Sequence, residues 1–224
     1  GTLRLSTPVA FGRLHVAPAL SRFLQAYPDV SVDLVAADEI VDLVETGIDV
    51  AIRIGVLQNS SLVARKLGAN QYVIAASPGY FERHAIPQKP SDLADHNCLI
   101  HKRSASPAAV WTFRRAQDSE RIEVSGNLRA DSFGIVKSAA CLGQGIALLP
   151  AWSAMPCVEA GELQLLLPEF EAHPGESESD GGIYVVYPHR KLVSPKVRAF
   201  VDFMVEYVGS TSCWSPHKAL PAAH

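Results

Sequence analysis

The fold is decided by residues 2–35, which read TLRLSTPVAFGRLHVAPALSRFLQAYPDVSVDLV. Apolar and polar residues alternate from Leu3 to Thr7 and again, less strictly, from Val30 to Val35, as they do in half-buried strands. Between these strands, apolar residues recur at helical spacing and indicate one buried helix face; they are Leu20, Phe23, Leu24 and Tyr27. Pro18 should start or kink this helix. Strand, helix and strand in series favour two parallel strands joined by a crossover helix.

The same pattern continues with a second helix and a third strand. A helix is expected over residues 38–46, with Asp38 as its N-cap and Gly47 just beyond its last turn. Its apolar positions are Ile40, Val41, Leu43 and Val44. The third strand covers residues 50–54 and ends at Gly55. These elements predict a parallel α/β sheet.

A second α/β pattern starts near residue 72. Short apolar segments predict strands at residues 73–76, 97–101, 111–113, 126–130, 146–149 and 183–187. Helices are expected at residues 78–85, 131–142 and 195–208, the last with Ser194 as its N-cap. Residues 168–182 are expected to form a solvated loop, because they hold five acidic residues and no lysine or arginine. Residues 209–224 show no periodicity and are expected to be a disordered tail.

Composition excludes several classes of protein. With 48% hydrophobic and 19% charged residues, the 224-residue chain has enough apolar material for a packed core, which excludes a mainly disordered protein. Its 20 basic and 23 acidic residues give a net charge of −3, so it does not bind nucleic acid through a bulk positive charge. The longest uncharged stretch, residues 138–158, is interrupted by glycine and proline, so no membrane segment is predicted.

Motif spacing predicts no metal site, no cofactor and no enzyme. Cys98, Cys141, Cys157 and Cys213 lie far apart, without a C-x-x-C pair or a histidine at ligand spacing. This usage is typical of reduced thiols in a cytosolic protein. The glycines of residues 143–145 follow a predicted helix and precede a predicted strand, the reverse of the order in a dinucleotide-binding turn. No G-x-S-x-G elbow marks a nucleophile, so no catalytic residue is predicted.

Three strand-to-helix junctions are candidate ligand-binding positions. In open α/β sheets, ligands bind beyond the carboxyl ends of strands, where helix N-termini offer N–H groups to anions. The junctions are residues 6–8, 36–38 and 131–133, and the hydroxyls of Ser6 and Thr7 suit a carboxylate. The alternative is that these hydroxyls only cap the following helix, and the local sequence favours neither interpretation.

An ordered series of segments resembles the effector-binding domain of LysR-type transcriptional regulators. It includes RLSTPVAFG at residues 4–12, DLVETGIDVAIRIG at residues 42–55 and GQGIALLP at residues 143–150. Further matching segments are residues 60–67, 76–80, 92–99, 111–113, 161–163 and 198–203. The resemblance spans residues 1 to about 208 in one order.

The resemblance implies a periplasmic-binding-protein-like α/β fold of two subdomains with a ligand cleft between them. Subdomain I would hold residues 1–72 and 183–208, and subdomain II residues 73–182. By position, the implied ligand-binding residues are Ser6, Thr7, Pro8, Ala37, Arg53, Ile54, His101, Lys102, Asp131, Ser132 and Phe133. Because Pro8 and Ala37 carry no hydroxyl, the anion contact would fall to Thr7, Arg53 or Lys102.

The resemblance also implies a function. The chain would sense a small, anionic organic effector, assemble into a homodimer or homotetramer, and modulate DNA binding and transcription by the full-length protein. DNA would be bound only through an N-terminal winged helix-turn-helix, which has no counterpart in these residues. The localisation would be cytoplasmic. Two alternatives stay open, a solute-binding protein of a transport system and a sensor that dimerises without any ligand.

Overall fold

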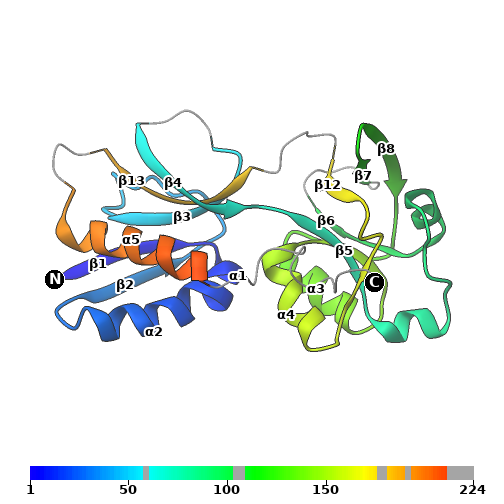
Figure 1. Ribbon diagram of the computed structural model, residues 1–224, viewed down its shortest axis with the longest axis horizontal. Coiled ribbons are helices and arrows are strands. Elements are labelled where there is room, and N and C mark those ends of the chain that lie inside the picture. Colours follow the sequence, from blue (N-terminus) through cyan, green and yellow to red (C-terminus); the bar gives the residue numbers. More distant parts are fainter. Residues whose placement is uncertain (58–60, 103–108, 176–180, 190–192, 211–224) are drawn as a thin grey trace. The chain divides into compact units, whose positions relative to one another are not determined.

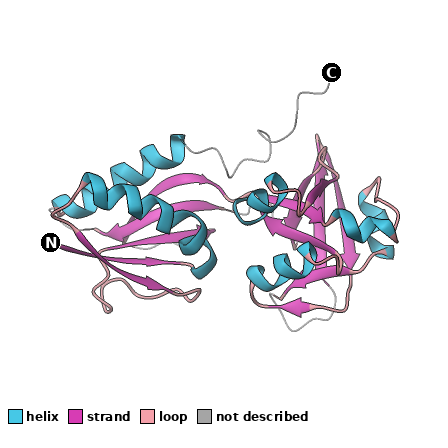
Figure 2. Cartoon of the chain, turned by 90° about the horizontal axis from the view of Figure 1, so that it is seen from below, coloured by secondary structure: helices cyan, strands magenta, loops and turns pink. Residues whose placement is uncertain are grey.

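The computed structural model describes residues 1–57, 61–102, 109–175, 181–189 and 193–210, which form two compact units (Figure 1). One unit contains Gly1–Asn70 and the described residues from Gly181 to Ser210. The other contains the described residues from Gln71 to Gly175. Each unit combines one mixed β-sheet with helices (Figure 2).

The sheet of the first unit has five strands in the order β2-β1-β3-β13-β4. Their bounds are Thr2–Thr7 for β1, Ser31–Ala36 for β2, Val50–Gly55 for β3, Leu62–Ala69 for β4 and Gly182–Pro188 for β13. Strand β1 runs parallel to β2 and β3, whereas β13 is antiparallel to β3 and β4. The predicted parallel arrangement of the first three strands is therefore confirmed, and its three carboxyl ends lie at one edge of the sheet.

Two helical segments cover this sheet. The first is a continuous run of α1 (Val9–Phe11), a π-helical turn (Gly12–Val16) and α2 (Ala17–Ala26). Pro18 therefore does not start the helix, and the wide turn ends two residues before this proline, which has no N–H to donate. The second is α5 (Pro195–Ser210). It begins where predicted, although the Ser194 backbone oxygen, rather than its hydroxyl, accepts hydrogen bonds from the first turn.

The helix predicted over residues 38–46 is wrong, because this segment is a loop with one turn. The carboxylate of Asp42 accepts hydrogen bonds from the backbone N–H groups of Val44 and Glu45, at 2.8 and 3.0 Å. An aspartate that binds its own following backbone competes with helix formation. The apolar spacing was also misleading, since Ile40 is 81% and Val44 68% exposed.

The second unit contains an eight-stranded sheet in the order β8-β7-β12-β5-β10-β6-β9, with β11 also paired to β5. Its strands are β5 (Tyr72–Ala76), β6 (Cys98–His101), β7 (Ala109–Arg115), β8 (Asp118–Val124), β9 (Arg129–Ala130), β10 (Ile146–Pro150), β11 (Gln164–Leu166) and β12 (Glu171–Pro174). Its helices are α3 (Phe133–Cys141) and α4 (Ala151–Glu159), with short 3-10 helices at Pro78–Glu82 and Pro90–Asp95. The short 3-10 turn at Pro78 replaces the longer helix expected over residues 78–85.

Burial on both faces of β5 explains its continuous apolar sequence. Val73 and Ala75 pack with α3 and α4 in one buried cluster, whereas Ile74 and Ala76 pack with Trp111 in another. Successive side chains of a strand point to opposite faces, so a strand covered on both faces is apolar throughout.

The expected loop over residues 168–182 is wrong in part. Residues Glu171–Pro174 form strand β12, which pairs with β7 on one side and β5 on the other. Residues 176–180 lie outside the described part of the chain. The predicted tail also lies outside it from residue 211 onward, and α5 extends two residues further than expected, to Ser210. Within the described residues, no helix is both long enough and apolar enough to cross a membrane.

A histidine pair packed on Tyr80 predicts a loss of stability in acid. The Tyr80 hydroxyl lies 3.2 Å from His96 Nδ1, and the ring of His84 stacks on Tyr80 at 4.1 Å. Burial, and then the charge of His84, lower the pKa of His96 below its ordinary value of 6.5. The unfolded chain therefore takes up this proton more readily than the folded chain, so the free energy of unfolding decreases as pH falls below about 6.5. Thermal unfolding at pH 7.5 and pH 5.5 measures this decrease.

The variant His96→Gln should lose less stability over the same pH interval than the wild type does. The exposed His189, replaced in His189→Gln, is the matched control and should leave the pH dependence unchanged. An equal loss of stability in wild type and His96→Gln would contradict this assignment.

Candidate functional site

A cavity of about 460 Å³ lies in the first unit, beyond the carboxyl ends of β1, β2 and β3. Its lining comes from these strand ends, from the loop after β2, and from β4 and β13. The lining residues are Ser6, Thr7, Pro8, Ala37, Asp38, Glu39, Ile40, Val41, Ala51, Ile52, Arg53, Ile54, Val56, Leu57, Leu62, Ala64 and Val186. Most of these side chains are apolar, and the polar ones gather at the strand ends.

The structure brings six of the predicted site residues together at this cavity. They are Ser6, Thr7, Pro8, Ala37, Arg53 and Ile54. Ser6 and Thr7 end β1 and are largely buried, at 5% and 1% exposure. The Thr7 hydroxyl donates a 3.4 Å hydrogen bond to the Pro8 carbonyl oxygen. Ser6 and Thr7 thus place two hydroxyl groups in a mostly apolar wall.

Arg53 is the cation of the cavity. Its Nη2 donates a 2.8 Å hydrogen bond to the carbonyl oxygen of Val41, which ties the side chain to the loop after β2. Burial lowers the pKa of Arg53, and the nearby Asp42 carboxylate partly opposes this effect. An arginine remains charged in proteins because its ordinary pKa lies far above neutrality. The site thus holds a fixed, partly desolvated positive charge.

Asp38 acts differently from its predicted role. Its Oδ1 accepts a 3.0 Å hydrogen bond from the backbone N–H of Val9, the first residue of α1. Asp38 thus caps the helix after β1 instead of a helix of its own. The first N–H of that helix already donates to a carboxylate. An incoming anion would therefore be bound by Arg53 and the β1 hydroxyls.

The remaining predicted residues form a second group in the second unit, at the parallel ends of β6 and β9 and the start of α3. The ring of His101 stacks on Phe133 with centroids 3.7 Å apart, and His101 Nε2 lies 3.1 Å from the Asp131 carbonyl oxygen. The backbone N–H of Lys102 donates to the Ala130 carbonyl at 2.6 Å. Ser132 is the residue before α3, and its carbonyl accepts the Val136 N–H.

The sequence does not reveal several apolar residues of the cavity lining. Ile40 and Val41 lie in the segment predicted as a helix, which does not form, and Leu62 and Ala64 belong to β4, which the sequence does not predict as a strand. Val186 comes from β13, far away in the sequence. The pairing of β13 with β3 brings it there, and no local signal reveals such a pairing.

Known proteins with similar sequences are regulators. A family model described as the LysR substrate binding domain matches residues 1–209. The HTH-type transcriptional regulator DmlR of Escherichia coli K12 is 35% identical over 207 residues, which cover 92% of this chain and 65% of DmlR. The HTH-type transcriptional activator TtdR of the same strain is 31% identical, over 92% of this chain and 64% of TtdR. The chain therefore spans slightly less than two thirds of these relatives.

Solved structures agree with the sequence matches. The regulatory domain of CrgA, a LysR-type transcriptional regulator from Neisseria meningitidis, has a TM-score of 0.77 at 29% identity and covers 93% of this chain and 99% of that domain. The full-length AphB virulence activator of Vibrio cholerae has a TM-score of 0.76 at 30% identity, over 92% of this chain and 68% of AphB.

These similarities confirm the predicted α/β fold class and the resemblance to transcriptional regulators. The family is not enzymatic and acts in the cytoplasm, which agrees with the predictions that the chain is no enzyme and is cytoplasmic. With a family model that spans nearly the whole described chain, and a cavity at the strand ends, the chain belongs to the LysR substrate binding domain family, the effector-binding regulatory domain of LysR-type transcriptional regulators.

Proposed function

We propose that this chain senses a small organic anion and passes the signal to a DNA-binding part of a longer regulator. The observation that carries the proposal is the cavity at the carboxyl ends of β1, β2 and β3, with Arg53 in its wall. Strand ends of this kind are the usual ligand sites of open α/β sheets. The relatives DmlR and TtdR, both HTH-type regulators, extend beyond the matched region, and DNA binding is assigned to that additional part.

The cavity supports an effector with an apolar body and one anionic group. Its volume of about 460 Å³ suits a small metabolite rather than a macromolecule. The carboxylate or another anion would contact Arg53 and Ser6, while Pro8, Ile54 and Val186 would face the rest of the molecule. The exposed Asp38 and Glu39 at the cavity would repel a second negative charge. These features favour a monoanion over a polyanion.

Removing the Arg53 charge should weaken effector binding. A hydrogen bond to a charged group contributes about 1.5–3 kcal/mol, so Arg53→Ala should reduce affinity roughly 10- to 150-fold. Small carboxylic acids are screened first by thermal shift on the wild type, and the best ligand is then titrated by calorimetry against both proteins. Arg65→Ala is the matched control, because Arg65 lies on β4 in an exposed ion pair with Asp202 and does not line the cavity.

An unchanged affinity in Arg53→Ala would contradict the assignment of the anion contact. The variant Lys102→Ala tests a separate prediction from the family resemblance, that the second group of residues also contributes to effector binding. A loss of affinity in Lys102→Ala supports that prediction, whereas wild-type affinity restricts the site to the cavity of the first unit.

Effector binding would act on transcription by shifting conformational populations. A ligand can shift an equilibrium only by its difference in affinity for the two states, typically about 1–3 kcal/mol in allosteric proteins. The family match supports this regulatory role over the alternative of a solute-binding protein of a transport system.

We further propose a homodimer formed through the β2 edge of the first sheet. Parallel strands are normally covered on both faces, yet five of the six residues of β2 are exposed. Apolar residues of β2, of the adjoining α2 and of the residue after α2 contribute to this surface with 37–39% exposure each; they are Leu24, Tyr27, Leu34 and Val35. An open strand edge also carries unpaired backbone groups that favour pairing with another chain.

Charged substitutions on this surface should dissociate the dimer. Sedimentation velocity should show the wild type as a dimer and the double variant Tyr27→Asp, Leu34→Asp as a monomer with unchanged circular dichroism. Ile86→Asp is the control, since Ile86 is 49% exposed on the second unit. A monomeric wild type, or a double variant that remains dimeric, would contradict this interface.

A further inference from the structure

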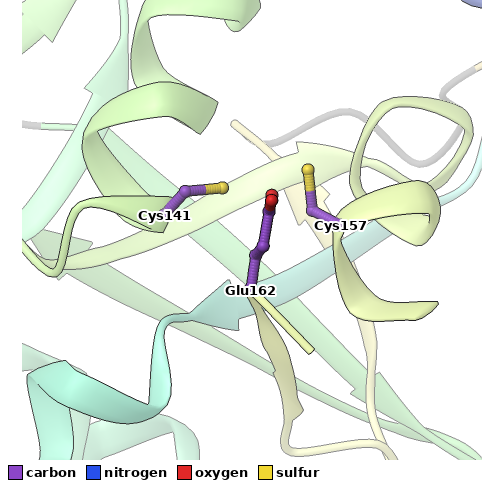
Figure 3. A group of neighbouring side chains, drawn as sticks. All are labelled: Cys141, Cys157 and Glu162. Atoms are coloured by element: carbon purple, nitrogen blue, oxygen red, sulfur yellow. The ribbon is translucent and has the colours of Figure 1, made fainter. Parts of the chain in front are cut away.

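Two cysteines and one glutamate from separate positions in the sequence meet in the second unit. The sulfurs of Cys141 and Cys157 and a carboxylate oxygen of Glu162 all lie within 4.8 Å of one another. In the view of Figure 3 the Glu162 carboxylate lies between the two sulfurs, and the Cys141 side chain points toward it. Within the described residues this is the one group of three or more potential metal ligands that lie this close.

The backbone fixes the position of Glu162 relative to Cys157. Gly161, with φ of +75°, ends α4 in the left-handed conformation. The Glu162 N–H then donates to the Cys157 carbonyl at 2.9 Å, and the Gly161 N–H donates to the Val158 carbonyl at 3.0 Å. These two bonds define a Schellman motif, which places the side chains at the positions of Cys157 and Glu162 near each other. The pair is therefore held by a helix end rather than by two flexible side chains.

The end of α3, where Cys141 is the last residue, forms the same motif. Gly143 has φ of +79°, the Gln144 N–H donates to the Ala139 carbonyl at 3.1 Å, and the Gly143 N–H donates to the Ala140 carbonyl at 3.0 Å. Helices α3 and α4 share one buried cluster, and Cys141 and Cys157 both pack at its rim. The three potential ligands are thus positioned by two helix ends in one packed unit.

We propose that Cys141, Cys157 and Glu162 form a binding site for a thiophilic divalent cation of the Zn²⁺ type. Zinc takes thiolate sulfur and carboxylate oxygen as ligands, and three protein ligands leave its fourth position to water. The carboxylate favours Zn²⁺ over Cu⁺, which selects sulfur ligands. The ion would join the C-terminal ends of α3 and α4.

The charges around the site are suitable for such an ion. Two thiolates and one carboxylate leave one net negative charge around a divalent cation, and the buried ammonium of Lys137 offsets it. Lys137 lies one turn before Cys141, donates to the Ser153 carbonyl at 3.3 Å, and interacts electrostatically with Cys157. Because a metal ion binds the thiolate form of cysteine, metal uptake releases the thiol protons, and affinity should increase with pH.

The test is metal binding by the reduced full chain after treatment with a chelator. Co²⁺ serves as the spectroscopic probe, and Zn²⁺ affinity is measured by competition with a chromophoric chelator. The wild type should bind one ion per chain, show a thiolate-to-cobalt charge-transfer band, and melt at a higher temperature with Zn²⁺. Cys141→Ser and Cys157→Ser should lose the band. Glu162→Gln should weaken Zn²⁺ binding at least about tenfold, because even the loss of a residue that only hydrogen-bonds to a metal ligand has an effect of this size.

Matched controls separate this site from other thiols and acids. Glu159→Gln replaces the glutamate that ends α4, and Cys98→Ala replaces the fully buried thiol on β6. Cys213→Ser replaces the cysteine outside the described residues. All three should bind Co²⁺ as the wild type does. The absence of a thiolate band in the folded wild type, or an undiminished band in Cys141→Ser, would overturn the proposal. The formation of a Cys141–Cys157 disulfide in air, without metal uptake by the reduced chain, would also overturn it.

Discussion

Replacing Phe23 by alanine should destabilise the first unit by about 3–5 kcal/mol, the usual cost of removing a buried phenylalanine. Phe23 is 0% exposed on α2. Its ring meets the rings of Phe200 and Phe203 of α5 edge-on, at centroid distances of 5.4 and 5.3 Å. The substitution removes the aromatic contacts between the two helices and leaves a cavity in the core. Urea unfolding followed by far-UV circular dichroism measures the change.

The control for this prediction is Gln25→Ala on the same helix. Gln25 is exposed, so its truncation should change the free energy of unfolding by less than about 0.5 kcal/mol. A loss below 1 kcal/mol in Phe23→Ala would mean that α5 does not depend on α2 for its position, contrary to the packing described above.

Gly145→Ala should strongly destabilise the second unit. A Cβ at this position would lie 2.2 Å from the Asn97 carbonyl oxygen, which also accepts the Ile146 N–H at 3.0 Å. The contact involves backbone at the start of β6, so it cannot be relieved by a side-chain rotation. Overpacking of this kind costs about 1–3 kcal/mol and sometimes more, and we expect the upper part of that range. The strand that carries His101 would be displaced with it.

Gly134→Ala provides the matched glycine control. The nearest atom to a Cβ there is the Ser132 hydroxyl oxygen at 3.4 Å, and Gly134 lies in α3. Alanine favours helix over glycine by up to about 1 kcal/mol, so this variant should be neutral or more stable. Urea unfolding followed by the fluorescence of the buried Trp111 and Trp152 compares the two variants. Equal stability of Gly145→Ala and wild type would show that β10 and β6 can separate at no cost.

The sequence predicts most elements whose burial is regular and misses several whose burial is not. Strands β1, β3, β5 and β10 are predicted because buried apolar residues recur along them. Strand β4 is not predicted because it is an edge strand with no fully buried residue. Helix α4 is not predicted because Pro156 suggests a break, although this proline lies inside the helix. Strand β12 is not predicted because its acidic neighbours suggest a solvated loop.

The candidate site can be predicted from the sequence where strand ends form its wall, but not where the following loop, β4 and β13 do. Ser6, Thr7 and Arg53 stand at strand ends, a place that the order of elements already indicates. The role of Asp38 depends on a contact with Val9, which only the folded chain reveals. The Cys141–Cys157 pair is likewise hidden in the sequence, because 15 residues separate the two thiols and no ligand spacing links them.

Effector binding at this cavity is tested most directly by a crystal structure of the chain with the tightest-binding carboxylic acid from the screen. We expect ligand density in the cavity at the ends of β1, β2 and β3, with the carboxylate in contact with the Arg53 guanidinium. Density for a bound ligand elsewhere in the chain, with this cavity containing only water, would contradict this expectation.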